Sequence, residues 1–432
     1  MLRSGAIDIT DNIDRLRSFY DPAYVRRVGI SRTSSPVQVC LDSRMLDVRG
    51  TGVATYAATL ARCLPSTGAE PMLLRQSQRP EQPAPTRPRR WLAAFDRSAR
   101  KAHRGGGSND EGQGAHDLIC ADVFREAQVF FNLHRQLMPV SADDPPPVMH
   151  WTYPVPLFLE GALNVYTIHD VIPLTHPSLT AISKRRHRAL LARVVERAHR
   201  IVAVTEAARS EIASTLELGG DRIVSLSQAV DIPLQSDPPL PEGVATGRYF
   251  FFCGLIDPRK NLIAMAKAHA MSGTTLPLVI AGPDGRDAAE IRKTLRQMPN
   301  VVLLSWVERP LLISLMRRAR AQVLVSLAEG FGLPIVEAMT LGTPVITSRL
   351  PATMEVAGDA AWLVDPGSLG DMAAAFTRLD QDQPLANRLR TLGFARSRHF
   401  TTEAYGQRLR DFYAQLAAEA SGGFGRAGET AA

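Results

Sequence analysis

One short segment indicates the architecture of the chain: Ala321-Gln322-Val323-Leu324-Val325-Ser326-Leu327-Ala328-Glu329-Gly330-Phe331-Gly332-Leu333-Pro334-Ile335-Val336-Glu337. It joins an apolar, β-branched strand to a glycine turn and an apolar helix. This order directs several backbone N–H groups at one anion. Glu329 is expected in the loop at the carboxyl end of the strand, and Glu337 inside the helix. N–H donors for a diphosphate and carboxylates for hydroxyls suit a sugar nucleotide, although an ordinary crossover with a solvated Glu329 has the same local pattern.

A second segment, residues 252–262, carries two cations after a strand. The strand ends at Gly254, and Arg259 and Lys260 are expected to open the next helix. Arginine can fork two phosphate oxygens and lysine supplies a point charge, so the pair suits a diphosphate leaving group. A solvated helix start is the alternative. It is disfavoured because cations at a helix N-terminus oppose the helix dipole.

The second half of the chain alternates short apolar runs with helical patterns. Strands are expected at 249–253, 278–281, 301–304, 321–325, 344–347 and 361–364. Apolar strands separated by helices indicate a parallel sheet covered on both faces. The first half has the same rhythm less regularly, with strands expected at 37–42, 129–131, 165–170 and 201–204 and a helix from 206. Two doubly wound α/β domains are therefore expected.

Composition predicts the domain boundaries. A proline-rich stretch, 237–241, marks the junction between two domains. Residues 77–116 contain four prolines and three consecutive glycines beside a basic patch, and we interpret them as an insertion with mobile edges. The expected order is an N-terminal extension (1–35), a first Rossmann-like domain (36–240) and a second one (241–400). A helix over 401–420 follows, and a low-complexity tail, expected to be disordered, fills 421–432.

Size and charge restrict the class of protein. With 432 residues and 45% hydrophobic content the chain has ample core for two soluble domains, and no apolar run is long enough to span a membrane. The net charge of +7 suggests acidic partners. Zinc-finger, RNP and helix-turn-helix signatures are absent from the sequence, so nucleic acid is not expected among them. The four cysteines are scattered without metal-ligand spacing, which fits a reducing cytosol.

The first half offers a histidine and a glycine turn. His169 comes at the end of a predicted strand, and the carboxyl ends of parallel strands line the ligand crevice of an open sheet. A neutral histidine there can bond a sugar hydroxyl, although a lone histidine is more often structural. Asp170 either orients its ring or caps the next turn. Gly52 lies in the first strand–helix turn, whose glycines either let a backbone approach a ligand or simply make a tight turn.

Together these motifs resemble the family 4 glycosyltransferases, which have the GT-B fold of two Rossmann-like domains facing across a cleft. The likeness covers residues 36–420 and is most specific at 252–262 and 323–346. His169-Asp170 is similar to the sugar-contacting histidine of bacterial polysaccharide mannosyltransferases. Thr55 departs from the pattern, since family members often carry arginine before the following tyrosine. Whether this loop contacts phosphate or acceptor is therefore open.

The resemblance implies a retaining transfer of a hexose from a nucleotide sugar, with GDP-mannose as the expected donor. The implied acceptor is a lipid-diphosphate-linked oligosaccharide in exopolysaccharide or surface-glycan synthesis. The resemblance implies His169 and Glu329 as catalytic residues. The donor-binding residues that it implies are Gly52, Gly254, Arg259, Lys260, Phe331, Gly332, Leu333 and Glu337. No side chain presents itself as a covalent nucleophile, so we expect front-face attack, with the leaving phosphate taking the acceptor's proton.

Other functions stay open at this point. They are a UDP-sugar-dependent transferase of the same fold, a nucleotide-sugar epimerase, and a silent sugar-nucleotide-binding subunit. No metal or other cofactor is expected. Asp380-Gln381-Asp382 follows a helical pattern, whereas the metal-binding motif of the other major glycosyltransferase fold follows a strand. Helix N-termini, Arg259 and Lys260 can neutralise the diphosphate instead.

Two basic amphipathic stretches, 87–104 and 184–200, favour contact with an anionic membrane surface. Trp91 in the first stretch is suited to the head-group level. Solvated helices are the alternative for both. With a lipid-linked acceptor, the protein is expected in the cytoplasm, peripherally associated with the inner face of the plasma membrane.

Overall fold

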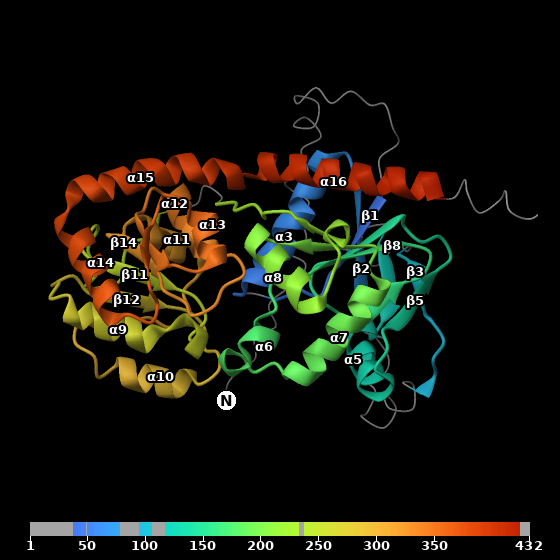
Figure 1. The fold of residues 1–432 in the computed structure, drawn as a ribbon, viewed down its shortest axis with the longest axis horizontal. Coiled ribbons are helices and arrows are strands. Elements are labelled where there is room, and N and C mark those ends of the chain that lie inside the picture. Colours follow the sequence, from blue (N-terminus) through green and yellow to red (C-terminus); the bar gives the residue numbers. More distant parts are fainter. Residues whose placement is uncertain (1–37, 49, 78–94, 106–116, 233–236, 424–432) are drawn as a thin grey trace, which may run out of the picture.

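The computed structural model describes residues 38–48, 50–77, 95–105, 117–232 and 237–423. The expected extension over 1–35, Trp91 and the tail from 424 lie outside these residues. Strands β1–β10 form one mostly parallel sheet in the first half of the chain, and β11–β16 form a parallel sheet in the second half (Figure 1). This is the α/β architecture of two doubly wound sheets that the sequence predicted.

The first sheet has the order β10-β9-β8-β6-β1-β2-β4-β3-β5-β7, and the second has the order β13-β12-β11-β14-β15-β16. The strands of the first are β1 (Gln38–Asp42), β2 (Glu70–Ser77), β3 (Arg100–Arg104), β4 (Leu118–Ala121), β5 (Met138–Ala142), β6 (Val148–Trp151), β7 (Leu157–Leu159), β8 (Leu163–Thr167), β9 (Arg200–Ala203) and β10 (Ile223–Ser225). The strands of the second are β11 (Phe250–Cys253), β12 (Leu278–Ala281), β13 (Val301–Leu303), β14 (Ala321–Leu324), β15 (Val345–Ser348) and β16 (Trp362–Val364).

Helices pack on both sheets. In the first half they are α3 (Gly52–Cys63), α5 (Val123–His134), α6 (Ile172–Thr175), α7 (Lys184–Arg197) and α8 (Glu206–Leu216). In the second half they are α9 (Leu262–Met271), α10 (Ala288–Leu295), α11 (Arg309–Arg317), α12 (Leu333–Thr340), α13 (Pro351–Ala357), α14 (Leu369–Gln381), α15 (Gln383–Ser397) and α16 (Thr402–Gly423).

The central strands of the second sheet are buried at every position. Strand β11 consists of three consecutive phenylalanines and a cysteine, all buried. Every residue of β12, β14 and β15 is likewise buried. Continuous apolar runs of this kind belong to parallel strands with helices on both faces. The six strands of this half begin and end within one residue of the expected positions.

One expected strand of the first half is wrong. Residues 129–131 lie inside helix α5, whose buried side chains recur at i, i+1, i+4, i+7 and i+8: Val123, Phe124, Ala127, Phe130 and Phe131. This is the period of one helical face. A short apolar run taken without its neighbours does not distinguish a strand from a buried helical turn.

The segment expected as an insertion contains a strand of the sheet. β3 pairs with β4 and β5, and its cations form ion pairs with acidic residues of the first half. This end of the basic stretch over 87–104 is therefore a paired strand, not the amphipathic helix that a membrane-binding role requires. Among the described residues, no helix combines the length and the apolar character needed to cross a bilayer.

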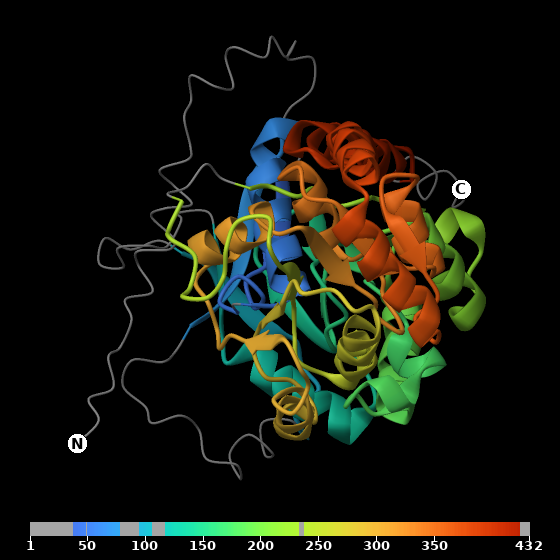
Figure 2. The ribbon, with the colours of Figure 1, turned by 90° about the vertical axis from the view of Figure 1, so that its left-hand side faces the viewer.

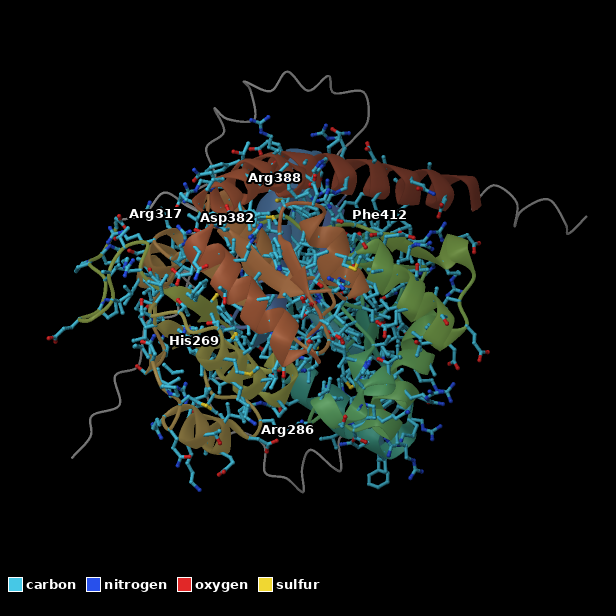
Figure 3. All side chains as sticks on the ribbon, turned by 60° about the vertical axis from the view of Figure 1, so that its left-hand side comes forward. His269, Arg286, Arg317, Asp382, Arg388 and Phe412 are labelled. Atoms are coloured by element: carbon cyan, nitrogen blue, oxygen red, sulfur yellow. The ribbon has the colours of Figure 1, made fainter. Side chains whose placement is uncertain are left out.

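The last two helices connect the halves. α15 and α16 lie end to end along one side of the molecule, first over the second half and then over the first (Figures 1 and 2). Phe412, labelled in Figure 3, belongs to α16. α16 packs on α3, and the Tyr413 hydroxyl lies 2.7 Å from Nδ1 of the buried His150 of β6. The helix continues to Gly423, three residues past its expected end.

Candidate active site

The strand order of the second sheet shows where a ligand is expected. With β11 as the first strand, the order β13-β12-β11-β14-β15-β16 is the 3-2-1-4-5-6 arrangement of nucleotide-binding sheets. The order reverses between β11 and β14, and ligands bind at the carboxyl ends of the strands beside such a reversal. Gly254 follows β11 and the loop with Glu329 follows β14. Both motifs found in the sequence therefore meet at this point.

Glu329 lies at the centre of an ion cluster. One carboxylate oxygen is 2.5 Å from Lys260 Nζ and accepts a hydrogen bond from the Ser326 hydroxyl at 2.7 Å, and the other is 3.0 Å from an Arg259 guanidinium nitrogen. The Glu329 side chain is only 8% exposed. Burial by itself raises its pKa, but Lys260 and Arg259 outweigh burial and lower the pKa to about 2. Glu329 is therefore an anion whose two oxygens are both engaged.

Arg259 and Lys260 do not open a helix, contrary to the prediction. They lie on a 3-10 turn, Pro258–Lys260, and α9 begins only at Leu262. The turn forms because the Asp257 side chain accepts the Lys260 N–H, and it ends because Asn261 adopts a left-handed conformation with φ 59°. The change matters for the site, because the turn leaves both cations within reach of Glu329.

Two glycines let β11 and β12 approach each other at their carboxyl ends. Gly254 has φ 150°, and Gly282, after β12, has φ 156°. A Cβ at Gly282 would lie 1.8 Å from the Gly254 carbonyl oxygen, so only glycine fits there. Gly282 was not predicted, and the Gly282-Pro283 dipeptide after a buried strand was the available signal.

Helix α12 opens at the predicted glycine turn. Gly332 precedes its first residue, Leu333, with φ 92°, a left-handed conformation that a side chain would strain. Phe331 and Leu333 flank it, so the first N–H groups of the helix lie at the carboxyl edge of β14. Free N–H groups at a helix start attract anions.

Glu337 is paired with a residue that the sequence analysis missed. It lies inside α12 as predicted, and its carboxylate is 2.5 Å from the guanidinium of Arg309 at the start of α11. The Glu337 side chain is 7% exposed, whereas that of Arg309 is 38% exposed. Arg309 is therefore a half-exposed cation beside a buried carboxylate, and no local pattern marks it in the sequence.

His169 follows β8 and is held as a neutral ring. Its Nε2–H donates to the Thr152 carbonyl at 3.0 Å, and the Tyr56 ring meets it edge-on at 4.7 Å. Burial lowers the pKa of His169 to about 4, so the imidazole is uncharged at neutral pH. Nδ1 is then unprotonated and can accept a hydrogen bond from a hydroxyl. Asp170 caps the next turn by accepting the Ile172 N–H, which resolves the two alternatives for this residue.

The two halves touch through glycines at this place. A Cβ on Gly330 would lie 2.3 Å from the His169 carbonyl oxygen, and the Thr205 hydroxyl donates to the Gly330 carbonyl at 3.0 Å. A Cβ on Gly52 would lie 3.5 Å from the Leu333 side chain. The fold therefore brings the predicted residues of the first half against those of the second.

Further contacts hold the halves together at the edges of this interface. Glu355 of α13 accepts the N–H groups of Glu206 and Ala207 at the start of α8, at 2.8 and 2.7 Å. Arg286, labelled in Figure 3, reaches from the turn before α10 to backbone carbonyls of the first half, those of Thr180 and Ser178. These contacts hold the two halves against each other on both sides of the site.

A buried carboxylate in the first half was also missed. Asp42 ends β1, is 0% exposed, and accepts the Thr152 N–H at 2.6 Å. Burial raises its pKa to about 6, although Thr152 and Arg44 act in the opposite direction. The signal in the sequence was an aspartate that ends an apolar run. The same signal is also typical of a residue that simply ends a strand.

The Asp380–Asp382 segment has a structural role. Asp380 accepts the Thr274 hydroxyl at 2.6 Å, and Asp382 caps α15 by accepting the Leu385 N–H at 2.8 Å. Asp382 lies between α14 and α15 (Figure 3). Within the part of the chain that the structure describes, no three His, Cys, Asp or Glu side chains converge as metal ligands do.

Comparisons with known proteins identify the family that the chain resembles. A family model described as "Glycosyl transferases group 1" matches residues 242–395, and one described as "Glycosyltransferase Family 4" matches residues 50–233. O-antigen chain mannosyltransferase B of Escherichia coli is 28% identical over 264 residues, which are 58% of this chain and 69% of that protein. The serotype-specific mannosyltransferase WbdA of Escherichia coli is 26% identical over 241 residues, which are 50% of this chain and only 29% of WbdA.

Among solved structures, a sucrose-phosphate synthase from Thermosynechococcus elongatus superposes with a TM-score of 0.64. The match covers 89% of this chain and 100% of that one at 17% sequence identity. A likeness at this identity supports the two-domain fold alone.

Proposed function

The chain belongs to the family 4 glycosyltransferases with the GT-B fold, and on this basis we propose that it transfers a mannosyl residue from GDP-mannose to a lipid-linked glycan. The curated relatives described above are named mannosyltransferases, which supports mannose as the sugar. The observation that supports the proposal most is the contact between Gly330 and the His169 carbonyl, which brings the ion cluster of Glu329, the glycine turn and the neutral imidazole close to one another.

The ion cluster is suited to a diphosphate. Arg259 and Lys260 place two positive charges beside Glu329, and the carboxylates of Asp257 and Asp170 also act on Arg259, so the two cations are held in place by acidic residues where an incoming diphosphate can meet them. We assign Arg259 and Lys260 to the leaving diphosphate, and Glu329 to the hydroxyls of the donor sugar. The backbone N–H groups of Phe331, Gly332 and Leu333 add donors without charge.

The remaining predicted residues complete the donor site. Glu337 is assigned to the ribose hydroxyls, with Arg309 beside it neutralising its charge. Gly254 and Gly52 keep side chains away from the diphosphate. Nδ1 of His169 accepts a hydrogen bond from a hydroxyl of the donor sugar, because its Nε2–H already donates to the Thr152 carbonyl.

Retention by front-face attack fits these charges. A nucleophilic carboxylate needs a free oxygen, and both oxygens of Glu329 are engaged by cations and a hydroxyl. Its low pKa also makes Glu329 a poor base. The leaving phosphate then takes the acceptor's proton, and Arg259 and Lys260 stabilise the charge that develops on it. In this mechanism no metal is needed.

The membrane assignment rests on α7. Lys184, Arg185 and Arg188 are exposed on this helix, and Ile182 just before it is 52% exposed. Exposed cations beside an exposed apolar side chain suit an anionic head-group layer, where each cation contributes about 1 kcal/mol. We propose that α7 rests on such a surface, close to a lipid-diphosphate-linked acceptor.

A panel of nucleotide sugars tests the function. The purified protein is incubated with GDP-mannose, UDP-glucose and UDP-N-acetylglucosamine, with and without EDTA, and the products are analysed by NMR. We expect cleavage of GDP-mannose, release of α-mannose and no effect of EDTA. Preference for a UDP-sugar would show that GDP-mannose is not the donor. An epimerised nucleotide sugar would show that the protein is an epimerase and not a transferase. Complete loss of activity with EDTA would contradict the metal-free mechanism.

Vesicle binding tests the membrane assignment separately. Sedimentation with anionic vesicles should weaken as salt rises, and Lys184→Gln with Arg188→Gln should weaken it further. Equal binding to neutral and anionic vesicles would contradict it. The pair Lys293→Gln and Arg296→Gln at the end of α10 is the control, because both residues are exposed and the pair removes the same charge from another surface.

A further inference from the structure

A row of buried polar side chains connects the last helix of the chain to strand β8 and helix α3. The Tyr413 hydroxyl on α16 lies 2.7 Å from Nδ1 of His150, and Nε2 of the same ring lies 2.8 Å from the Thr167 hydroxyl at the end of β8. The Thr167 hydroxyl in turn lies 2.8 Å from the Tyr56 hydroxyl on α3. All four residues are at most 2% exposed. The row therefore joins α16 to three elements of the first half, α3, β6 and β8.

Each member of this row depends on its neighbours. Burial lowers the pKa of His150 to about 3, so the ring is neutral and donates through one nitrogen while it accepts through the other. One of its two partners must therefore donate to it, and the other must accept from it. Removal of either hydroxyl leaves a buried ring nitrogen without a partner, which is unfavourable. A second tyrosine of α16, Tyr405, also interacts with the Tyr56 hydroxyl.

Tyr56, at the end of the row, also contacts His169. The two rings meet edge-on, with their centres 4.7 Å apart and an angle of 89° between their planes. The hydrogen bond from Nε2–H to the Thr152 carbonyl holds one atom of the His169 ring and still permits the ring to turn about that atom. Contact with the Tyr56 ring restricts this turning, because the two rings are packed against each other in a buried place. Tyr56 therefore determines the direction in which Nδ1 of His169 points.

We propose that Tyr56 is a positioning residue, which keeps Nδ1 of His169 directed at the donor sugar. Tyr413 holds Tyr56 in place through the row of buried side chains. Because α16 follows α15, which lies along the second half, the row links the orientation of His169 to the helix that connects the halves (Figure 1). The assignment rests on the proposed glycosyl transfer and adds the residues that orient its histidine.

NMR of the histidine rings tests the positioning without any donor. The protein is prepared with isotope-labelled histidine, and the nitrogen signals of His169 are identified by their loss in His169→Gln. In the wild type we expect one tautomer, with Nε2 protonated and Nδ1 unprotonated. In Tyr56→Leu the ring can turn away from Thr152, and we expect shifts averaged between the two tautomers. Tyr56→Phe keeps the ring but detaches it from the row, so it should shift the signals in the same direction by less, and it replaces Tyr56→Leu if that variant does not fold.

Steady-state kinetics test whether Tyr56 acts through His169. Tyr56→Leu should lower kcat for GDP-mannose about 30-fold with little change in KM, since a misdirected group slows turnover more than it weakens donor binding. In a His169→Ala protein the same change should have no further effect, because the group that it positions is absent. Tyr413→Phe should lower kcat roughly fivefold. Tyr249→Phe is the matched control: it removes a buried hydroxyl that donates to the Leu315 carbonyl in the second half, and it should leave kcat and the His169 signals unchanged.

The outcomes separate this proposal from the proposed function. Unchanged His169 signals in Tyr56→Leu overturn the positioning role, even if turnover falls. A further loss of about 30-fold when Tyr56→Leu is added to His169→Ala also overturns it, since Tyr56 would then act independently of the histidine. Unchanged signals and unchanged kcat in Tyr413→Phe would contradict the contribution of α16. A wild type that cleaves no nucleotide sugar, but whose His169 signals respond to Tyr56→Leu, supports the positioning and overturns the transfer.

Discussion

Each half of the molecule buries a carboxylate where the strand order of its sheet reverses, and the two carboxylates differ in their partners. Glu329 in the second half has two cations and a hydroxyl, and its pKa is lowered to about 2. Asp42 in the first half accepts the Thr152 N–H, with only the Thr152 side chain and Arg44 acting on it further, and its pKa is raised to about 6. Burial raises the pKa of both groups, and only at Glu329 do the neighbouring cations and hydrogen bonds outweigh it. The second half thus pairs its buried carboxylate directly with two cations, whereas the first half does not.

The two shifts have opposite consequences for stability. The folded-state pKa of Glu329 lies below its ordinary value of 4.5, so its ionised form stabilises the fold above pH 4.5, and this stabilisation is lost as the pH falls toward 2. The folded-state pKa of Asp42 lies above its ordinary value of 3.8. Its ionisation therefore destabilises the fold, fully above pH 6, and the cost disappears as the pH falls toward 4.

The largest effect is expected from Glu329→Gln. Glutamine keeps the shape but removes the anion that two buried cations require. We expect turnover of GDP-mannose to fall about 300-fold, equivalent to about 3.4 kcal/mol, while GDP still binds, because Lys260 and Arg259 remain. Steady-state kinetics and calorimetry with GDP check this. Near-normal turnover, or a sugar trapped covalently on Glu329, would contradict the assigned role.

Asp42→Asn should stabilise the fold at neutral pH, because the ionised Asp42 carboxylate destabilises it whereas the ionised Glu329 carboxylate stabilises it. Removing a carboxyl whose pKa is raised from 3.8 to about 6 should stabilise the fold at pH 7 relative to pH 4, by up to about 3 kcal/mol. Urea unfolding of the wild type and the variant at both pH values measures this difference. An identical difference at pH 4 and pH 7 would show that Asp42 ionises normally in the folded protein, and the contrast with Glu329 would then fail.

Lys260→Ala should lower donor turnover by a smaller factor than Glu329→Gln does. The variant removes one charge-assisted contact to the diphosphate but leaves Arg259 in place. We expect donor turnover to fall roughly 30-fold, equivalent to about 2 kcal/mol. Lys293→Ala, at an exposed lysine of α10, is the control and should have no effect. Unchanged kinetics in a folded Lys260→Ala protein would remove this residue from the site.

Gly330→Ala tests how the two halves come together. Its backbone φ is not in the left-handed region, so an alanine is resisted by its neighbours: a Cβ would lie 2.3 Å from the His169 carbonyl oxygen and 3.1 Å from the Asp170 Cβ. We expect turnover to fall about tenfold, with little change in the affinity for GDP, because the halves can no longer close fully. Gly370→Ala on α14 is the control, since its nearest contact is 4.0 Å away. A fully active Gly330→Ala enzyme would show that this contact is dispensable.

Much of the second half could be predicted because its signals are local, and its six strands follow from runs of apolar residues. The positions of Glu329 in this half and of His169 in the first half follow from the rule that strand ends line the crevice. The errors were also local. Residues 129–131 resemble a strand only when their neighbours in the helical period are left out, and Arg259 and Lys260 resemble a helix start although Asp257 and Asn261 limit them to a single 3-10 turn.

By itself, the sequence determined the two α/β sheets, the glycine turns and the residues at the strand ends, because these depend on periodicity and turn chemistry over a few residues. Only the tertiary structure decided which charges meet. Lys260 reaches Glu329 across 69 positions and Asp42 reaches Thr152 across 110. Such pairs form where the strand order of a sheet reverses, so no short pattern contains them. For the same reason, two aspartate or glutamate residues that look alike in the sequence acquired pKa values on opposite sides of their ordinary range.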